Sequence, residues 1–278
     1  MNTPVDRMLE SVRVMPSIPK ALQQIMESLN NPNSTVEDIT EPLSHDPALT
    51  AKVLRMSNTA HYGLPRQVAA VEEAVLLVGV EAVRTMVIAS GLVGAFDAIK
   101  GFDMKRFWRL SLLSGAIARD LAKKTGLVNS EHAYTAALMH GLGVLAIHGA
   151  FPDSSLQIDK SCTDQDVHQR AILEMNYLGF HHGHIGEKIS TAWHLPEQIG
   201  KAIRFYPNPE MLNAPVLALV VFSALALAID LEDEKPVDQW GQAITNQVLQ
   251  RMKIDRNVFA GNEQKWTEYR ESTDSIVS

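Results

Sequence analysis

Apolar residues recur at helical spacing through most of the chain, and this periodicity decides the fold class. Near the N-terminus, four of them follow the i, i+3, i+4, i+7 rule of an amphipathic helix that ends near residues 30–32: Leu22, Ile25, Met26 and Leu29. No segment shows the sustained alternation of apolar and polar residues between hairpin turns that is typical of β-strands. The sequence therefore predicts an all-α protein.

Polar capping residues divide the periodic pattern into separate helices. Asp46 and Asp103 are predicted to be N-caps, because a carboxylate there accepts a hydrogen bond from a backbone N–H of the first turn. Ser34 and Glu37 have the spacing of a capping box, and Asn58 tolerates the left-handed conformation of a helix C-cap. These signals and the periodicity predict helices at about 35–43, 47–57, 71–78, 81–92, 103–121, 130–139, 164–178, 182–193, 197–205, 214–229 and 239–252.

We expect two helical subdomains followed by a C-terminal helical extension. Gly91, Gly94 and Gly101 mark a break before the Asp103 cap, so the first boundary is placed there. The expected units are an N-terminal helical subdomain, a second helical subdomain and the extension, at residues 1–102, 103–230 and 231–278. The extension is expected either to pack on the helical bundle or to form a contact between subunits.

Composition excludes several classes of protein. The single cysteine, Cys162, rules out an internal disulfide scaffold and a Cys-rich zinc site. With 32 acidic and 25 basic residues, the net charge of −7 opposes wrapping of nucleic acid. Residues 214–229 carry no charge but are fewer than the ~20 that a bilayer requires, so a buried helix is expected instead of a membrane span. The N-terminus has no signal-peptide pattern, and a cytoplasmic location is expected.

The order and spacing of several short motifs resemble the HDOD family of bacterial signalling proteins. These motifs are HDPALT at 45–50, VLRMSNTA at 53–60, EAVLLVG at 73–79, FWR at 107–109, YTAALMH at 134–140, LGFHH at 178–182 and WHLP at 193–196. The resemblance runs from about residue 15 to residue 229. It implies an all-α fold whose second subdomain is an HD-like helical bundle.

The resemblance also implies a degenerate metal site. HD phosphohydrolases, to which the family is related, hold divalent metal with a His, a His-Asp pair and a distal Asp. In this sequence the matching positions are Leu110, His140 followed by Gly141, and Leu225. Leucine and glycine side chains cannot coordinate a cation, so His140 is the one vestigial metal position and no bound metal or other cofactor is expected.

Other candidates for chemistry are weaker. His182 and His184 can approach His140 across the bundle as a three-histidine remnant, but the sequence identifies no carboxylate to orient it. The alternative is that His140 and His182 are packed, hydrogen-bonded core residues. Cys162 lies in a polar segment with no basic cluster to activate it, so an ordinary thiol is expected.

Residues 45–66 are the most distinctive segment for recognition. Capping explains Asp46 and Asn58, and it leaves a set of polar, aromatic and basic residues around a loop: Arg55, Thr59, His61, Tyr62 and Arg66. This composition is typical of an interaction surface, and an ordinary solvated loop is the alternative. Too few basic residues cluster there for nucleic-acid binding.

The resulting hypothesis is a non-enzymatic regulatory module that binds other proteins in a second-messenger, chemotaxis or motility circuit. The resemblance implies signalling partners in trans, among them diguanylate cyclase, phosphodiesterase or receiver-domain proteins, with no membrane insertion. The alternative is a metal-dependent phosphohydrolase of nucleotides or cyclic dinucleotides with an unconventional site. A third hypothesis is that the cleft near His140 binds a small ligand without turning it over.

Overall fold

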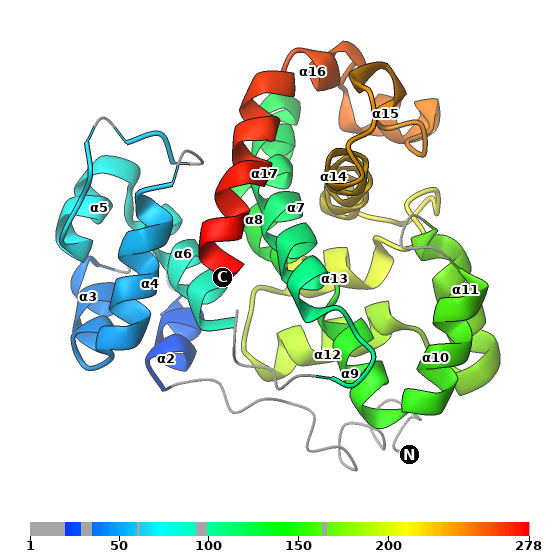
Figure 1. Ribbon diagram of the computed structural model, residues 1–278, viewed down its shortest axis with the longest axis horizontal. Coiled ribbons are helices and arrows are strands. Elements are labelled where there is room, and N and C mark those ends of the chain that lie inside the picture. Colours follow the sequence, from blue (N-terminus) through cyan, green and yellow to red (C-terminus); the bar gives the residue numbers. More distant parts are fainter. Residues whose placement is uncertain are drawn as a thin grey trace.

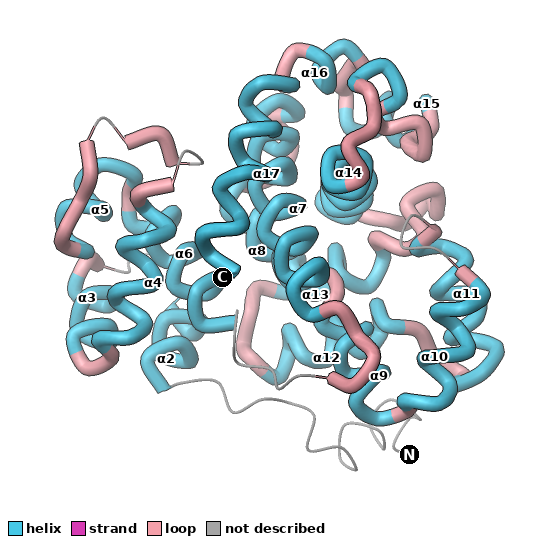
Figure 2. The backbone as a smooth tube through the Cα atoms, viewed as in Figure 1, coloured by secondary structure: helices cyan, strands magenta, loops and turns pink. Residues whose placement is uncertain are grey.

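The computed structural model describes residues 20–28, 35–59, 62–64, 66–92, 99–162 and 166–277, and every regular element within them is helical (Figures 1 and 2). The all-α prediction is confirmed. The longer helices are α2 (Lys20–Ser28), α3 (Glu37–Ser44), α4 (Pro47–Ser57), α5 (Val71–Val78), α6 (Val80–Leu92), α7 (Met104–Thr125), α8 (Ser130–Met139), α9 (Leu142–Ala150), α10 (Pro152–Ser161), α11 (Val167–Leu178), α12 (His182–Ala192), α13 (Glu197–Phe205), α14 (Val216–Glu232), α15 (Asn246–Met252) and α17 (Glu263–Val277). A 3₁₀ turn, η1 (Val237–Gln239), and the short α16 (Asn257–Ala260) lie between them.

The first group of helices, α2 to α6, packs around α6. Every residue of α6 from Ala82 to Leu92 is buried, and α2, α4 and α5 lie against this helix. The predicted apolar face of α2 is present, since Leu22, Ile25 and Met26 are buried. Leu29 lies outside the described residues. The apolar stripes predicted from the sequence therefore meet in one core.

The predicted end of α4 at Asn58 is confirmed, although its backbone geometry differs from a left-handed cap. Before α3, the backbone N–H of Thr35 donates to Asp38 Oδ2 at 2.7 Å. Ser34 lies outside the described residues. Asn58 ends α4 with a φ of −83°, which is not left-handed. Its side-chain amide instead bonds both backbone groups of Val68, at 2.8 and 2.9 Å, and so ties the end of α4 to the loop before α5.

The second group of helices is built around α7, which packs against α8, α14 and α17. Asp103 caps its N-terminus by accepting from the Arg106 N–H at 2.9 Å, as predicted. Gly126 ends it at a φ of +64°, a conformation that glycine adopts without steric cost. Figure 1 shows α7, α8 and α17 between the α2–α6 group on one side and α9–α13 on the other.

The uncharged stretch at 214–229 forms most of α14, and this helix is buried against α7, α8 and α13. The buried-helix prediction is thus confirmed. Within the described residues, no helix is long and apolar enough to cross a bilayer.

Three of the longer helices were not predicted, and one was misplaced. The segments 142–150, 152–161 and 263–277 form α9, α10 and α17. Residues 239–245 lie mostly in turns, so α15 begins only at Asn246. The helix α17 packs on α7 and also contacts α4 and α14. Within this structure the C-terminal extension therefore packs on the bundle.

A buried arginine joins the two groups of helices. Arg119 of α7 lies between two aromatic rings, 4.9 Å from the centroid of Tyr62 and 4.4 Å from that of Tyr134. Its guanidinium pairs with Glu131 at 2.6 Å, and Thr85 of α6 donates to the same carboxylate at 3.1 Å. Because Tyr62 and Thr85 belong to the first group, this cluster couples the two.

Candidate functional site

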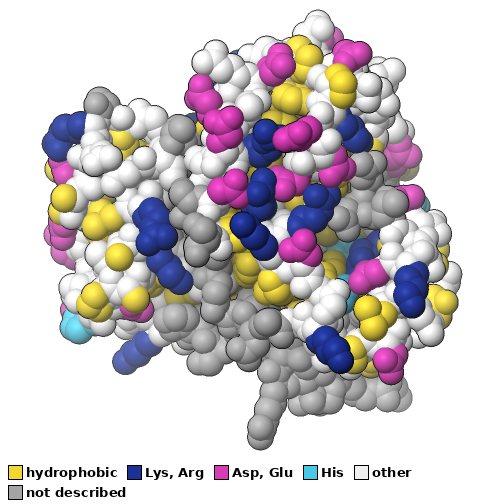
Figure 3. All heavy atoms as spheres, in the orientation of Figure 1, with side chains coloured by type: hydrophobic (Ala, Val, Ile, Leu, Met, Phe, Trp, Pro, Cys, Tyr) yellow, Lys and Arg dark blue, Asp and Glu magenta, His cyan; other side chains and the backbone are white. Residues whose placement is uncertain are grey.

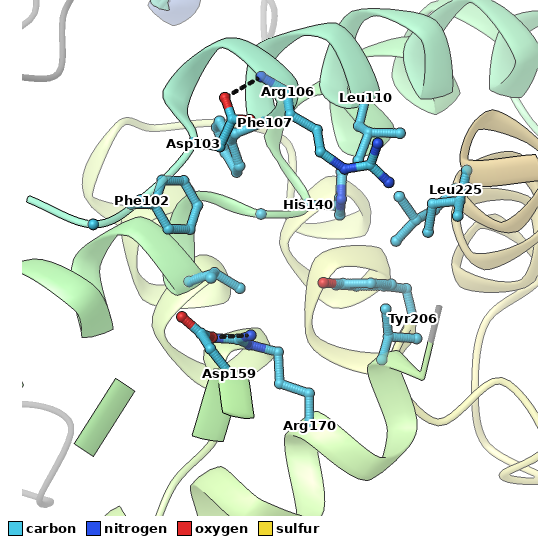
Figure 4. A pocket seen from close by; sticks show the side chains of 15 residues that line it. Phe102, Asp103, Arg106, Phe107, Leu110, His140, Asp159, Arg170, Tyr206 and Leu225 are labelled. Carbon is cyan, nitrogen blue, oxygen red and sulfur yellow. Dashed lines mark hydrogen bonds and ion pairs between the residues drawn. The ribbon is translucent and has the colours of Figure 1, made fainter. Parts of the chain in front are cut away.

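A pocket opens where the N-terminal turns of α7 meet the connection between α8 and α9, and Figure 4 shows it from close by. Its cavity measures about 270 Å³. All four positions that the resemblance assigns to metal ligands line it: Leu110, His140, Gly141 and Leu225. The structure therefore brings together residues that are more than a hundred positions apart in the sequence.

His140 is buried in the wall of this pocket. Its Nδ1 lies 2.5 Å from the Ala137 carbonyl oxygen, which can only accept, so the N–H is on Nδ1 and Nε2 carries a lone pair. Burial, together with nearby His182, lowers the pKa of His140 to about 4, although the hydrogen bond to Ala137 opposes this shift. The imidazole is therefore neutral at pH 7.

The resemblance places Gly141 at the position of the aspartate in the His-Asp pair of HD enzymes. The space beside Gly141, where a side chain would lie, is occupied by a neighbouring residue. A Cβ built on Gly141 lies 2.5 Å from Cε2 of Phe107, closer than real Cβ atoms approach a neighbour. The aromatic ring of Phe107 thus occupies the space that a carboxylate side chain would need.

The remaining two positions are apolar and buried. Leu110 of α7 and Leu225 of α14 are 8% and 5% exposed and offer no ligand atoms. Among the described residues, no group of three or more His, Cys, Asp and Glu side chains is arranged to hold a metal ion. The residues present therefore do not fit the metal centre of the HD enzymes, and no reaction step can be routed through one here.

Asp159 and Arg170 line the opposite wall of the pocket and belong to a longer chain of polar side chains. Arg170 of α11 pairs with Asp159 through Nη1 at 2.8 Å and with Glu174 through Nε at 3.0 Å. Asp159 also bonds His148 Nε2 at 2.8 Å, and Glu174 bonds His182 Nδ1 at 2.6 Å. Charged partners stabilise both carboxylates, so the pKa values of Asp159 and Glu174 are lowered despite their burial.

Glu174 is the residue that the sequence reasoning missed. It is fully buried and accepts from both Nδ1 and the backbone N–H of His182, so it orients that ring. Its spacing of four residues from Arg170 was the available signal, because i, i+4 pairs lie on one helix face. The sequence identified no carboxylate for these histidines, and the structure provides one for His182.

Close packing of α9 against α12 places His182 near the pocket. A Cβ on Gly143 would collide with the His182 carbonyl oxygen, so only glycine permits this approach. The ring of Tyr206 lies next to both histidines, with its centroid 5.3 Å from that of His140 and 5.5 Å from that of His182. His140 and His182 are thus packed core residues on either side of a tyrosine.

His184 does not join them. Its Nδ1 accepts from the His181 N–H at 3.2 Å, and the two rings lie 3.9 Å apart in a capping box at the start of α12. Burial, together with neighbouring His182 and His184, lowers the pKa of His181 to about 3. The three-histidine remnant is therefore not assembled.

Cys162 is a half-buried thiol that donates to the Ile158 carbonyl oxygen at 3.2 Å. Burial raises its pKa, which opposes formation of a thiolate. His168 bonds the Pro207 carbonyl oxygen instead. Cys162 and His168 therefore bond to separate backbone carbonyls and do not form a nucleophile–base pair with each other.

The proposed interaction residues are spread over different environments. Arg55 and Arg66 are exposed, and Arg66 pairs with Glu73. Thr59 is half-buried and donates to the Met56 carbonyl oxygen at 2.7 Å, while Tyr62 packs on Arg119. His61 lies outside the described residues.

Basic and acidic side chains are interleaved over α7, α14 and α17 on the face that Figure 3 shows. Ion pairs account for this pattern: Arg106 with Asp233, Arg109 with Glu232, and Arg270 with Glu234. This face therefore presents no continuous positive field of the kind that attracts nucleic acid.

Known proteins resemble both the sequence and the fold. A family model described as HDOD domain matches residues 15–209. A solved structure from Shewanella amazonensis SB2B, named "Putative phosphohydrolase", is 28% identical, with a TM-score of 0.83 and coverage of 100% of this chain and 99% of that chain. An HDOD domain protein of unknown function from Geobacter sulfurreducens has a TM-score of 0.73 at 22% identity, over 98% of this chain and 97% of that one.

Two further relatives are longer than this chain. A "Putative signal transduction protein" from Marinobacter aquaeolei VT8 has a TM-score of 0.73 at 23% identity, over 98% of this chain but 62% of that one. An uncharacterized protein of Treponema pallidum (strain Nichols) is 27% identical over 232 residues, 81% of this chain. The match spans 44% of the length of that curated relative.

Proposed function

The chain belongs to the HDOD family, and from that premise we propose that it is a cytoplasmic regulatory module that binds signalling proteins without hydrolysing a phosphoester. One observation carries the proposal: of the four positions that would hold metal, His140 alone has a ligand atom, and Phe107 fills the space beside Gly141. The signal-transduction name of the Marinobacter relative supports the same role.

The chemistry of the pocket supports binding over hydrolysis. Phosphoester hydrolysis in HD-type enzymes depends on a cation to activate water and to neutralise charge on the phosphoryl oxygens. Leu110 and Leu225 supply no ligand for that cation, and the carboxylates of Asp159 and Glu174 are already committed to ion pairs. The pocket therefore lacks the ligands that would hold a catalytic cation.

Partners in trans are part of the proposal. Diguanylate cyclases, phosphodiesterases and receiver-domain proteins are the candidates, and the exposed side of α4 and the following loop is the proposed contact. Arg55 and Arg66 lie there, and the exposed side chain of Leu76 on α5 is a neighbouring apolar contact. Charged and apolar groups in one exposed area are typical of protein interfaces.

A metal-dependent hydrolase is the second candidate. The pairing of His182 with Glu174 favours it, because a carboxylate that orients a histidine is common around metal ligands. The name of the Shewanella relative points the same way. This candidate requires a ligand set that uses His182 and His140 together, with further oxygen ligands from substrate or water.

Metal content and phosphodiesterase activity distinguish the two candidates. The untagged protein, purified without added metal, is expected to carry less than one metal ion per chain and to leave a chromogenic phosphodiester intact with Mn²⁺ or Mg²⁺. Stoichiometric metal, with hydrolysis that is lost in His140→Ala and retained in His45→Ala, would overturn the proposal. His45 is the matched control because it is an exposed histidine on another helix end.

The binding half of the proposal is tested by affinity capture from the native host. The protein is expected to retain a signalling protein, and the double variant Arg55→Glu, Arg66→Glu is expected to lose it. Capture that is unchanged in this variant would refute the assigned surface, and repeated capture of no signalling protein would refute the role itself.

A further inference from the structure

The pocket beside His140 has the dimensions and chemistry of a ligand site. Pockets for drug-sized molecules range over about 300–1,000 Å³, and this cavity of about 270 Å³ lies just below them. The volume of the pocket therefore suits a group of the size of a single heterocyclic base. A whole dinucleotide is larger than this volume.

The walls favour a flat ring. Phe102, Phe107 and Tyr206 line the pocket from different sides, and aliphatic side chains of α7 and α14 fill the space between them. In Figure 4 the Tyr206 side chain extends into the opening, with Phe102 across from it. Aromatic walls of this kind stack on or meet the edge of a planar ligand.

Charge in the pocket is balanced. Two arginines, Arg106 and Arg170, face two carboxylates, Asp103 and Asp159. Arg170 pairs with Asp159 at 2.8 Å, and Arg106 pairs with Asp233 at 3.0 Å. A site in which opposite charges cancel gives no net attraction to an ion, so an uncharged ligand is favoured.

Two hydrogen-bonding groups remain for a ligand. Tyr206 Oη, for which the described residues provide no hydrogen-bond partner, can donate. Burial raises the pKa of Tyr206, so its hydroxyl keeps the proton. His140 Nε2, with its lone pair, accepts. A carboxylate or phosphate oxygen would meet that lone pair unfavourably, whereas a ligand N–H would bond to it.

We propose that this pocket binds a small uncharged oxo-heterocycle, a ring with adjacent carbonyl and N–H groups such as a free purine or pyrimidine base. The carbonyl oxygen accepts from Tyr206, the ring N–H donates to His140, and the ring stacks between the aromatic walls. The inference rests on the proposed non-enzymatic role, because the ligand is held as a signal and not consumed.

A ligand-observed NMR titration with hypoxanthine tests the proposal, and it requires neither a protein partner nor metal. The wild-type protein is expected to bind hypoxanthine with one saturable site. Tyr206→Phe, which keeps the ring and removes the hydroxyl, is expected to weaken binding about five- to tenfold, the effect of one hydrogen bond. His140→Phe, which removes the acceptor, is expected to weaken it similarly.

Tyr177→Phe is the matched control, because Tyr177 is exposed and lies outside the pocket. It is expected to leave binding unchanged, and circular dichroism of each variant verifies its fold. Absence of saturable binding at millimolar hypoxanthine, tighter binding of benzoate or inorganic phosphate, or equal affinity in wild type and both pocket variants would each overturn the proposal. None of these outcomes bears on partner capture, so the two proposals fail separately.

Discussion

Burial of the His140 imidazole makes its protonation costly in the folded state. Its pKa is about 4 in the folded protein and about 6.5 in an unfolded chain, so the unfolded state binds more protons between these values. The stability that the neutral His140 contributes is present above pH 6.5 and is lost as the pH falls toward 4. We expect the free energy of unfolding to decrease by about 3 kcal/mol from this residue alone over that window.

Urea denaturation at pH 7.0 and pH 4.5 measures this loss. His140→Gln cannot titrate, and its amide can still donate to Ala137, so its stability should fall less over the same range. Burial also lowers the pKa of His181, which adds a decline in wild type and variant alike. An equal pH dependence in the two proteins would contradict the assignment to His140.

Gly141 and Phe107 allow the proposed loss of a metal site to be tested by reversal. Gly141→Asp restores the carboxylate of the His-Asp pair, but its Cβ meets the Phe107 ring. We expect the variant to be destabilised by about 1–3 kcal/mol from overpacking, and to bind no stoichiometric metal because Leu110 and Leu225 are unchanged. Phe107→Ala in the same chain should recover part of the stability, as a double-mutant cycle will show.

Stoichiometric Mn²⁺ in Gly141→Asp, measured by elemental analysis, would show that the aspartate alone was limiting. A cycle with no coupling between positions 107 and 141 would show that the ring does not obstruct the side chain.

At the residue scale, sequence reasoning placed individual positions better than their surroundings. Leu110, His140 and Leu225 were selected from motif order, and they line one pocket. Phe107 and Glu174 were missed as parts of the site, because their roles depend on contacts between helices distant in sequence. The spacing of apolar residues indicates which face of a helix is buried. It does not indicate which side chains of other helices pack against that face.

At the scale of elements, α17 covers a face of α7 with large apolar side chains. Trp266 is fully buried, and its Nε1 donates to Asp120 Oδ2 at 3.1 Å. Trp266→Ala is expected to reduce stability by about 3–5 kcal/mol through lost contacts and a cavity. Urea unfolding provides the measurement, with Gln264→Ala on the exposed side of the same helix as control. A loss below about 1 kcal/mol would mean that α17 contributes little to the fold.

Local signals explain which helices were predictable. Asp46 and Asp103 act as caps through neighbours three residues away, so their identity was enough to locate α4 and α7. The helices α10 and α17 are rich in polar residues and lack a clear apolar stripe. Tertiary packing stabilises them more than their own pattern does, and a pattern-based prediction therefore overlooked them.

Across the whole molecule, the Arg119 cluster makes the two groups of helices dependent on each other. Arg119→Met removes one member of a largely buried ion pair and leaves Glu131 without its counter-charge, which is expected to cost about 3–5 kcal/mol. The double variant Arg119→Met, Glu131→Gln should recover at least half of that loss, because no buried charge is left unpaired. Thermal unfolding measures both.

A loss in the double variant as large as in Arg119→Met would assign the cost to packing on Tyr62 and Tyr134 and not to charge. The sequence anticipated two helical units, and their boundary near Asp103 stays a prediction. The sequence did not predict the Arg119 cluster. Tyr62 was assigned to the proposed interaction surface, and Arg119 was given no role.

The position of α17 against α7 also has a consequence for synthesis. A ribosome that has completed the start of α7 at Met104 must add 159 more residues to reach Glu263, where α17 begins. At about 5–20 residues per second this takes roughly 8–30 s, during which the apolar face beneath Trp266 has no cover. The nascent chain thus offers a transient binding surface to chaperones. This surface is covered only when residues 263–277 emerge and α17 packs on α7.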